Sequence, residues 1–409
     1  MILFIAPNPK STNKHEGFLQ RISAIDKLFT EEEKIYYEDL SGDAEVTNAL
    51  LRARTIYVHS IYEAARVIDL YEIYGYKIIT DLHGVVVEEL ALAGEDGMTT
   101  GFAAIEAKVF QYSTKFVVVT KAMADYFEKK YSYQNNEYEW ITLPIFNSFS
   151  GGQCHKKNAK PLHIIYAGGV QPWQNVNLML EATRKLGDKY KFTYLTHDTQ
   201  MFQDIKDLAT VKSVDHNEIS EYYQKSHFGL MLRDNSVINR VACPTKLIEY
   251  LENDIIPIIK DPNIGDFIEL GYQYVTIEQI TSKDFSDKEM IGMIRNNRKV
   301  LRKLLSLTNK SKVELRDAVL QDKSRLINID TILRSATEGL LKINKLELDK
   351  AVTTEKLNAE VNMLHAIKSE LKAKSTELDN IKKSKSFKMG NFISMPYRMI
   401  KLVIKRVFK

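Results

Sequence analysis

The stretch CPTKLIEYLENDIIPII, residues 243–259, joins a helix and a strand with almost no loop between them. Proline is favourable at the start of a helix, so the pattern predicts a helix that begins near Pro244 and holds Lys246 and Glu249 within one turn. The β-branched run that follows, DIIPIIK at 254–260, predicts a strand. A helix that leads directly into a strand is typical of the repeating units of an α/β fold.

The same alternation continues outward from this stretch. One series of strand patterns, separated by helical patterns, consists of ILFIAP (2–7), TIYVHS (55–60), KIITDL (77–82) and KFVVVT (115–120). A second series consists of LHIIYAGG (162–169), KFTYLTH (191–197), KSVD (212–215) and HFGLMLR (227–233). The polar stretch NSFSGGQCHKKNAKP (147–161) separates the two series. The sequence therefore predicts two Rossmann-like domains with parallel sheets, at residues 1–150 and 160–335.

Length and composition fit two globular domains with an appendage. The chain has 409 residues, of which 44% are hydrophobic and 27% charged, and single cores seldom grow beyond ~300 residues. Two cysteines, Cys154 and Cys243, are too few for a disulfide framework, so we expect a reducing, cytoplasmic compartment. We expect no signal peptide and no membrane span, because no apolar run approaches the ~20 residues that a bilayer requires.

The C-terminal part differs in composition from the two domains. Residues 340–385 are predicted to form a helical extension, in which leucines recur every seven residues at Leu357, Leu364, Leu371 and Leu378, as in one seam of a dimeric coiled coil. The alternate seam is polar, so a solvated helix remains an alternative. The tail, residues 386–409, is short, basic and amphipathic. From Asn380 onward there are nine Lys or Arg and no acid, which predicts docking on the anionic inner face of the cell membrane.

Two loops of the second domain carry residues suited to a phosphate-containing ligand. In a doubly wound sheet, ligands bind at the carboxyl ends of strands, and phosphates favour the N-termini of helices. Gly168, Gly169 and Val170 follow a predicted strand, and glycine allows close approach of a ligand. The helix near Pro244 directs the N–H groups of Thr245 and Lys246 at an anion, while Glu249 suits a ribose diol. A simple surface pair of Lys246 and Glu249 is the alternative.

These segments, YAGGVQPWQNVNLMLEA, HFGLMLRDNSVINR and CPTKLIEYLENDIIPII, resemble bacterial glycosyltransferases of the GT-B fold, specifically family 4. DLHG (81–84) and VVVTKAMADYFEKKY (117–131) resemble the matching segments of the first domain, and the resemblance covers about residues 1–335. It implies two domains facing a cleft and transfer of a sugar from a nucleotide-diphosphate donor, held by the second domain. It also implies donor contacts from Thr245, Lys246 and Glu249, and a glycan, lipid-linked or protein-linked acceptor in bacterial surface polysaccharide or glycoconjugate synthesis.

The sequence departs from this family in the donor loops. The family commonly has an Arg and a Lys where this chain has Gly169 and Gln174, and a second Glu where it has Val241. A departing diphosphate needs cationic or N–H stabilisation, so we expect Arg233, Arg240 or both to replace the missing pair. Two surface arginines are the alternative interpretation.

Candidates on the acceptor side follow strands of the first domain. His83 comes after KIITDL, at a carboxyl end, where it could contact the donor sugar or an acceptor hydroxyl. A structural histidine that is hydrogen-bonded to Asp81 is the alternative. Glu16 and Gly17 follow the first strand, and Glu88, with Glu89 beside it, lies at a predicted helix start, where acids are also common for structural reasons.

The sequence leaves three classes of function open. The preferred interpretation is a hexosyltransferase-type glycosyltransferase that uses a nucleotide sugar and no other cofactor. We expect no metal, because there is no Asp-x-Asp pair of the kind that holds a divalent cation in other sugar transferases, and no nucleic-acid partner, because no nucleic-acid-binding fold is present. The alternatives are an epimerase or phosphorylase on the same fold, and a non-catalytic scaffold that forms homodimers through 340–385.

Overall fold

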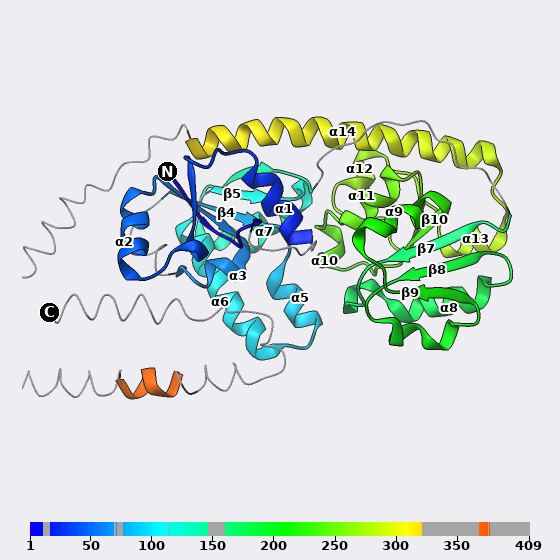
Figure 1. The fold of residues 1–409 in the computed structure, drawn as a ribbon, viewed down its shortest axis with the longest axis horizontal. Helices are drawn as coiled ribbons and strands as arrows, with labels where there is room; N and C mark the ends of the chain where they lie inside the picture. The colour runs from blue at the N-terminus through cyan, green and yellow to red at the C-terminus, as the bar shows by residue number, and fades with distance from the viewer. Residues whose placement is uncertain are drawn as a thin grey trace, which may run out of the picture.

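The computed structural model describes residues 1–10, 17–68, 71, 77–113, 115–145, 160–320, 368–374 and 376. They form an α/β protein of two lobes, each built on a parallel sheet (Figure 1). In the described residues no helix is both long and apolar enough to cross a membrane.

The first sheet has the strand order β2-β1-β3-β4-β5-β6, with every neighbouring pair parallel. Its strands are β1 (Ile2–Ile5), β2 (Lys34–Tyr36), β3 (Thr55–His59), β4 (Lys77–Leu82), β5 (Lys115–Val118) and β6 (Glu139–Thr142). The apolar side chains of β1 and β3 are fully buried, and Phe4 stacks on Tyr36 with ring centroids 5.2 Å apart. The continuous burial explains why these strands read as unbroken apolar runs.

The second sheet has the order β11-β10-β7-β8-β9 and is also parallel. Its strands are β7 (His163–Ala167), β8 (Lys191–Leu195), β9 (Ala209–Lys212), β10 (Phe228–Met231) and β11 (Ile256–Ile259). The segment KSVD, predicted as a strand, mostly follows β9 instead of forming it. Two edge strands of the first sheet, β2 and β6, were not predicted at all.

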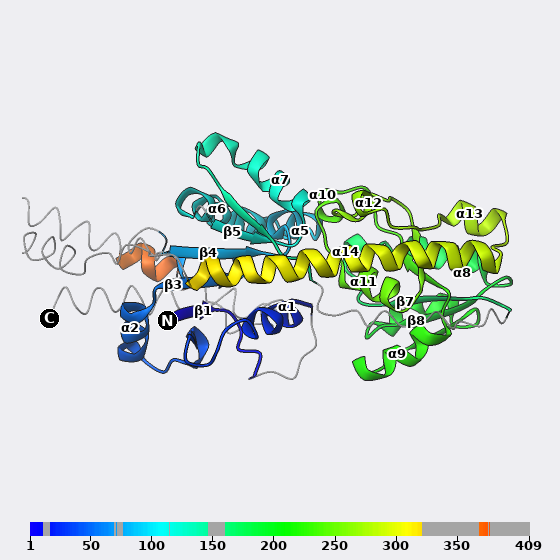
Figure 2. The ribbon, with the colours of Figure 1, turned by 90° about the horizontal axis from the view of Figure 1, so that it is seen from above.

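Helices cover both faces of each sheet, as the alternating pattern predicts (Figures 1 and 2). Those of the first lobe are α1 (Gly17–Asp26), α2 (Asp43–Arg52), α3 (Ser60–Ala64), α5 (Val86–Leu92), α6 (Asp96–Tyr112) and α7 (Lys121–Lys130), with η1 (Tyr37–Asp39) and η2 (Ser132–Gln134). The second lobe has η3 (Pro172–Gln174), α8 (Val176–Leu186), η4 (Thr199–Ile205), α9 (His216–Lys225), α10 (Val237–Arg240), α11 (Thr245–Glu252), α12 (Phe267–Leu270) and α13 (Ile277–Ser282).

The long helix α14 (Asp287–Leu320) runs along both lobes (Figure 2). Its N-terminal part packs on the second lobe, where Met290 and Ile294 join that core, whereas Leu315 and Val319 lie in the core of the first sheet. The Thr55 hydroxyl donates to the carbonyl of Val319 at 3.0 Å. One helix therefore ties together two lobes that are otherwise separate in sequence.

Polar contacts also join the lobes directly. The Asp266 carboxylate of the second lobe accepts hydrogen bonds from the N–H groups of Lys121, at 2.7 Å, and Ala122, at 3.0 Å, in the first turn of α7. The Thr120 hydroxyl donates to the carbonyl of Val241 at 2.6 Å. The two bonds to Asp266 satisfy helix N–H groups that have no partner within α7, and the Thr120 bond links the start of that helix to the second lobe.

Several C-terminal predictions fall outside the described residues. Of the predicted extension, residues 368–374 and 376 are described, and they are helical. Most of the heptad leucines and the whole tail at 386–409 lie outside, so the coiled coil and the amphipathic tail stay predictions.

Candidate functional site

The candidate site lies where the carboxyl ends of strands from both lobes meet. Helix α5 follows β4 in the first lobe, α10 follows β10 in the second, and the two helices are in contact. Ligands of doubly wound sheets bind at such carboxyl ends. The sequence-predicted donor residues and His83 all lie on segments that lead into this region.

The loop after β7 is shaped by a glycine that has little room for a side chain. Gly168 has φ +153°, and a Cβ at this position would lie 2.5 Å from Nζ of Lys246. The hydroxyl of Tyr166 donates to the carbonyl of Gly169, which fixes the loop beyond it. Val170 is partly buried against the core of the second lobe. The ammonium of Lys246 therefore lies directly against the glycine loop.

Lys246 reaches the glycine loop from α11, about eighty residues later in the chain. Its side chain is buried, and Nζ lies 3.7 Å from the ring centroid of Tyr166 and 3.4 Å from Oε1 of Gln174. Gln174 is the position where the resembling family commonly has a lysine. Burial, together with the nearby Arg233, holds the pKa of Lys246 well below its ordinary value. Lys246 thus supplies a cation beside Gln174 and the glycine loop, and Gly169 of that loop is the position where the resembling family commonly has an arginine.

Arg233 follows β10 and is the second buried cation of this region. Its side chain is 8% exposed, and its Nε is buried without a hydrogen-bond partner in the described residues. Burial lowers its pKa, while Tyr166 and Glu89 oppose that shift. A buried guanidinium nitrogen without a partner costs free energy. Two such cations close together, with no carboxylate paired to either in the described part of the chain, favour a site for an anion.

Glu249 lies one turn beyond Lys246 on α11. The hydroxyl of Tyr223 donates to its Oε2 at 2.8 Å, which orients the carboxylate, and the side chain is partly exposed. At the start of α11, Pro244 provides no side-chain cap for the N–H groups of the first turn, which begins at Thr245. Lys246 and Glu249 therefore do not form the simple surface pair of the alternative interpretation, because the Lys246 side chain is buried.

Arg240 does not join the buried pair. It ends α10, its side chain is exposed, and Nη1 donates to Oδ1 of Asn235 at 2.7 Å. Of the two arginines expected to replace the missing basic pair, the structure places Arg233 beside Lys246 and leaves Arg240 at the surface.

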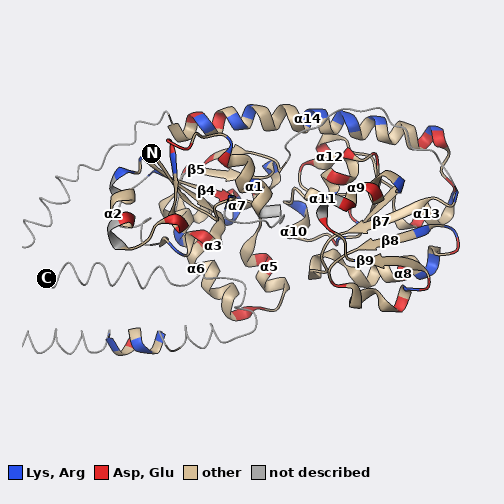
Figure 3. Cartoon of the chain, in the orientation of Figure 1, with Lys and Arg blue, Asp and Glu red and all other residues tan. Residues whose placement is uncertain are grey.

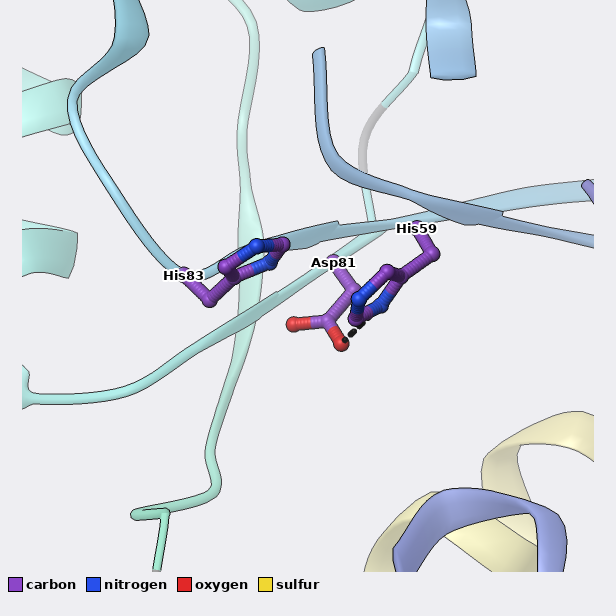
Figure 4. Close-up of side chains that lie close together, drawn as sticks. All are labelled: His59, Asp81 and His83. Carbon is purple, nitrogen blue, oxygen red and sulfur yellow. Dashed lines mark hydrogen bonds and ion pairs between the residues drawn. The ribbon is translucent and has the colours of Figure 1, made fainter. Parts of the chain in front are cut away.

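His83 lies at the end of a buried polar network that begins at Arg21 and passes through Asp81 and His59. Figure 4 shows Asp81, His59 and His83. The Arg21 guanidinium donates to both oxygens of Asp81, at 2.6–2.9 Å, and the Tyr57 hydroxyl donates to Oδ2 at 2.8 Å. The His59 Nδ1 also bonds Oδ2, at 3.3 Å, and the His59 ring stacks on His83 with centroids 4.5 Å apart. His83 therefore contacts the network through a ring and not through the Asp81 carboxylate.

The network fixes the charge states of these groups. Although burial alone would raise it, Arg21 holds the pKa of Asp81 well below its ordinary range. Burial, with the neighbouring His59, lowers the pKa of His83 to about 3. His83 is therefore neutral at physiological pH and a weak base, which suits hydrogen bonding to a sugar hydroxyl better than proton abstraction.

The donor atoms of His59, Asp81 and His83 lie within 4.8 Å of one another, as in some metal sites. Two features make the set a poor fit for a cation. Both oxygens of Asp81 already accept hydrogen bonds from Arg21, Tyr57 or His59. The two rings are stacked, with 19° between their planes, whereas an imidazole binds metal in the plane of its ring. We therefore interpret the cluster as an ordering network.

The two adjacent glutamates of α5 have different surroundings. Oε1 of Glu88 accepts from Tyr126 at 2.5 Å and from Lys130 at 2.6 Å, and Lys130 also pairs with buried Glu106. Glu88, the predicted acceptor-side residue, thus belongs to a network within the first lobe.

Glu89 lies nearer to the second lobe. A Cβ on Gly84 would be 2.8 Å from its Oε1, so the glycine makes room for this carboxylate. Burial raises the pKa of Glu89, and Arg233 of the second lobe partly offsets that shift. Of the remaining acceptor candidates, Gly17 is the first residue of α1, and Glu16 lies outside the described residues.

Sequence reasoning missed the aromatic and histidine residues that support this site. Tyr166, Tyr223 and His59 lie in strands or helices where they read as ordinary core residues, and each becomes informative only through its partner. For His59, the one available signal was its position at the carboxyl end of a predicted apolar strand, the same kind of position that His83 has in DLHG.

Solved structures resemble this chain over most of its length. HepE of Anabaena, determined in complex with UDP and glucose, is 10% identical, and the match covers 77% of this chain and 98% of HepE with a TM-score of 0.53. A trehalose-6-phosphate synthase, OtsA, is 10% identical, covering 78% of this chain and 99% of OtsA with a TM-score of 0.50. No protein-family model and no curated protein matches the sequence. The likeness shows that the chain has the GT-B fold, with two Rossmann-like lobes facing a cleft.

Proposed function

We propose that this protein is a glycosyltransferase that moves a sugar from a nucleotide-diphosphate donor to an acceptor hydroxyl. The single observation that carries the proposal is the buried pair Lys246 and Arg233 beside the glycine loop. In the described part of the chain neither cation has a carboxylate partner within ion-pair distance. A diphosphate would supply the missing negative charge.

Each part of a nucleotide sugar has a candidate partner in this arrangement. The diphosphate would contact Lys246, Arg233 and the first N–H groups of α11, because unpaired N–H groups at a helix start favour anions. Glu249, held by Tyr223, would accept hydrogen bonds from the ribose diol. His83, neutral and positioned from the first lobe, would hydrogen-bond the sugar. As the glycosidic bond breaks, negative charge grows on the diphosphate, and the two cations stabilise it there.

The fold comparison supports the choice of donor class. HepE shares the fold and was determined with UDP and glucose, so UDP-sugars are the first probes to use. A non-catalytic scaffold would have no need to keep two costly buried cations next to a glycine loop. We propose no cofactor beyond the donor and no metal, because Lys246 and Arg233 already provide the positive charge that a cation would bring.

The test is turnover with a defined donor panel. The full-length chain is incubated with UDP-glucose, UDP-galactose, UDP-N-acetylglucosamine or GDP-mannose, with and without added EDTA, and nucleotide release is measured in the presence of hydroxyl acceptors. We expect release with one donor, unaffected by EDTA and lost in R233A/K246M. Absence of turnover with every donor, or equal turnover in the double variant, would contradict the proposal.

The cellular setting is a further part of the proposal. We propose that the protein is a glycosyltransferase similar to those of family 4 and acts in bacterial surface polysaccharide or glycoconjugate synthesis. We also propose that it is a peripheral protein on the inner face of the cell membrane. The nine cations from Asn380 onward support membrane docking, and the heptad leucines support a homodimer. Deletion of residues 387–409 should release the protein from anionic vesicles, and unchanged binding would argue against docking by the tail.

A further inference from the structure

The outer face of α14 carries a row of exposed side chains, most of them cationic or apolar. Residues three or four apart share one side of a helix. Six exposed residues lie on one such side, with exposed Ser306 between Arg302 and Lys310, and we call these six the α14 ridge: Ile291, Arg295, Lys299, Arg302, Lys310 and Val313. The opposite side of α14 packs on both lobes through residues such as Leu301 and Leu315. The ridge is therefore held rigidly along the outside of the protein.

The charge on this segment has one sign. Between Met290 and Val313 there is no Asp or Glu, although the protein outside its C-terminal tail has an excess of acids. Figure 3 shows Lys and Arg along α14, with acids near its two ends. An ordinary solvated helix mixes both signs. The absence of acids over six turns favours a partner that is negatively charged.

Not every cation of this segment belongs to the ridge. Arg298 pairs with Asp254 at 2.6 Å, and Lys303 donates to the carbonyl of Leu270 at 3.2 Å, so both turn toward the body of the protein. No acidic partner is present for Arg295 or Arg302 among the described residues. Lys299 donates to Oδ1 of exposed Asn296 at 3.2 Å. The outward-pointing cations of the ridge therefore have no carboxylate partner within the described part of the chain.

The apolar members of the ridge distinguish between kinds of anionic partner. Ile291 is 40% exposed and Val313 is 62% exposed, and 22 residues of helix place them about 33 Å apart. Nucleic acid would contact the cations but offers no apolar layer for these side chains. A phospholipid surface offers both, since cations bind headgroups while apolar side chains enter the acyl boundary.

We propose that the α14 ridge lies on an anionic phospholipid surface. The stems of its Lys and Arg residues lie along the interface with their charges among the phosphates, and Ile291 and Val313 contact the acyl boundary. Because α14 is fixed to both lobes, this contact sets the orientation of the whole protein on the membrane. The proposal is separate from docking by the tail and does not depend on glycosyl transfer.

The test compares two triple charge reversals in the full-length chain. The ridge variant is R295E/K299E/R302E, and the control is K129E/K185E/K225E, which changes the net charge equally at exposed positions in the last turns of α7, α8 and α9. Co-sedimentation is measured with vesicles of 30% phosphatidylserine in phosphatidylcholine. Both variants are repeated in the chain lacking residues 387–409, so that the contribution of the tail is measured independently.

Each Lys or Arg near such a surface contributes about fivefold to partitioning, so the ridge variant should bind at least ~100-fold more weakly. The control variant should stay within about fivefold of the unaltered chain, and the difference should persist without the tail and shrink at high salt. The neutral variant R295Q/K299Q/R302Q should fall between the two. The proposal would be overturned if the ridge and control variants lost vesicle binding equally, or if the ridge variant lost none. It would also be overturned if the unaltered chain bound duplex DNA through the ridge as tightly as it binds vesicles.

Discussion

Replacement of Lys246 by methionine should change stability and ligand binding in opposite directions. The ammonium is buried against the Tyr166 ring, 3.7 Å from its centroid, and among the described residues no carboxylate pairs with it. Methionine keeps the apolar stem and removes a buried charge, so we expect the free protein to become more stable by about 1–3 kcal/mol. Loss of a buried, charge-assisted contact to a diphosphate costs about 2–5 kcal/mol, which is a roughly 30-fold to several-thousand-fold weaker Kd for UDP.

The same substitution has a pH signature. Folding lowers the pKa of Lys246 below its unfolded value of 10.5, so between these two values the unfolded chain binds one more proton than the folded chain. The free energy of unfolding then rises with pH, by at most about 1.4 kcal/mol per pH unit for one proton. The stability advantage of K246M at neutral pH should therefore shrink as the pH approaches 10.

The assay combines UDP titration calorimetry with urea unfolding at several pH values. The control is K185M, which alters an exposed lysine on α8 and should leave both properties unchanged within error. If K246M binds UDP as tightly as the unaltered chain, or is less stable at neutral pH, then the Lys246 ammonium does not bind the diphosphate in the way proposed, and the reasoning is refuted.

Three further predictions follow from individual contacts. In G168A the added Cβ would lie 2.5 Å from Nζ of Lys246 at a φ of +153°, so UDP affinity should fall at least about tenfold by calorimetry; unchanged affinity would show that the loop is not part of the site. E249Q should weaken UDP binding about tenfold but leave inorganic pyrophosphate binding unchanged, and equal losses for both ligands would place Glu249 on the diphosphate. D81N leaves Arg21 buried and unpaired, so urea unfolding at pH 7 should show a loss of about 3–5 kcal/mol. Because folding lowers the pKa of Asp81, the unaltered chain should lose this stabilisation only as the pH falls below about 4. The difference in unfolding free energy between D81N and the unaltered chain should therefore be smaller at pH 3 than at pH 7, and an equal difference at both pH values would contradict the prediction.

The fold was largely predictable because its central strands are buried on both faces. Strands such as Ile2–Ile5 and Ile256–Ile259 read as apolar runs, and this pattern depends only on local sequence. The edge strands β2 and β6 are three and four residues long and carry polar residues, so their pairing with a neighbour defines them more than their composition does. The path of α14 was also hidden, because Leu315 and Val319 meet the first sheet some three hundred residues away in sequence.

The site was predictable in its loops but not in its partners. The spacing of Thr245, Lys246 and Glu249 indicated an anion site, yet nothing in the sequence shows that Lys246 fills the space beside Gly168. The choice between Arg233 and Arg240 depended on which side chain is buried. The sequence does not show this, because the two arginines lie only seven residues apart in the same loop region. These properties arise from contacts between lobes and strands, so only the three-dimensional structure distinguishes them.

The most direct test of the central claim is a crystal structure of the full-length protein with UDP. The account predicts diphosphate oxygens within about 3 Å of Nζ of Lys246 and of the Arg233 guanidinium, with the ribose hydroxyls on the carboxylate of Glu249. A nucleotide bound elsewhere, with Lys246 and Arg233 still buried and without a phosphate between them, would contradict the account.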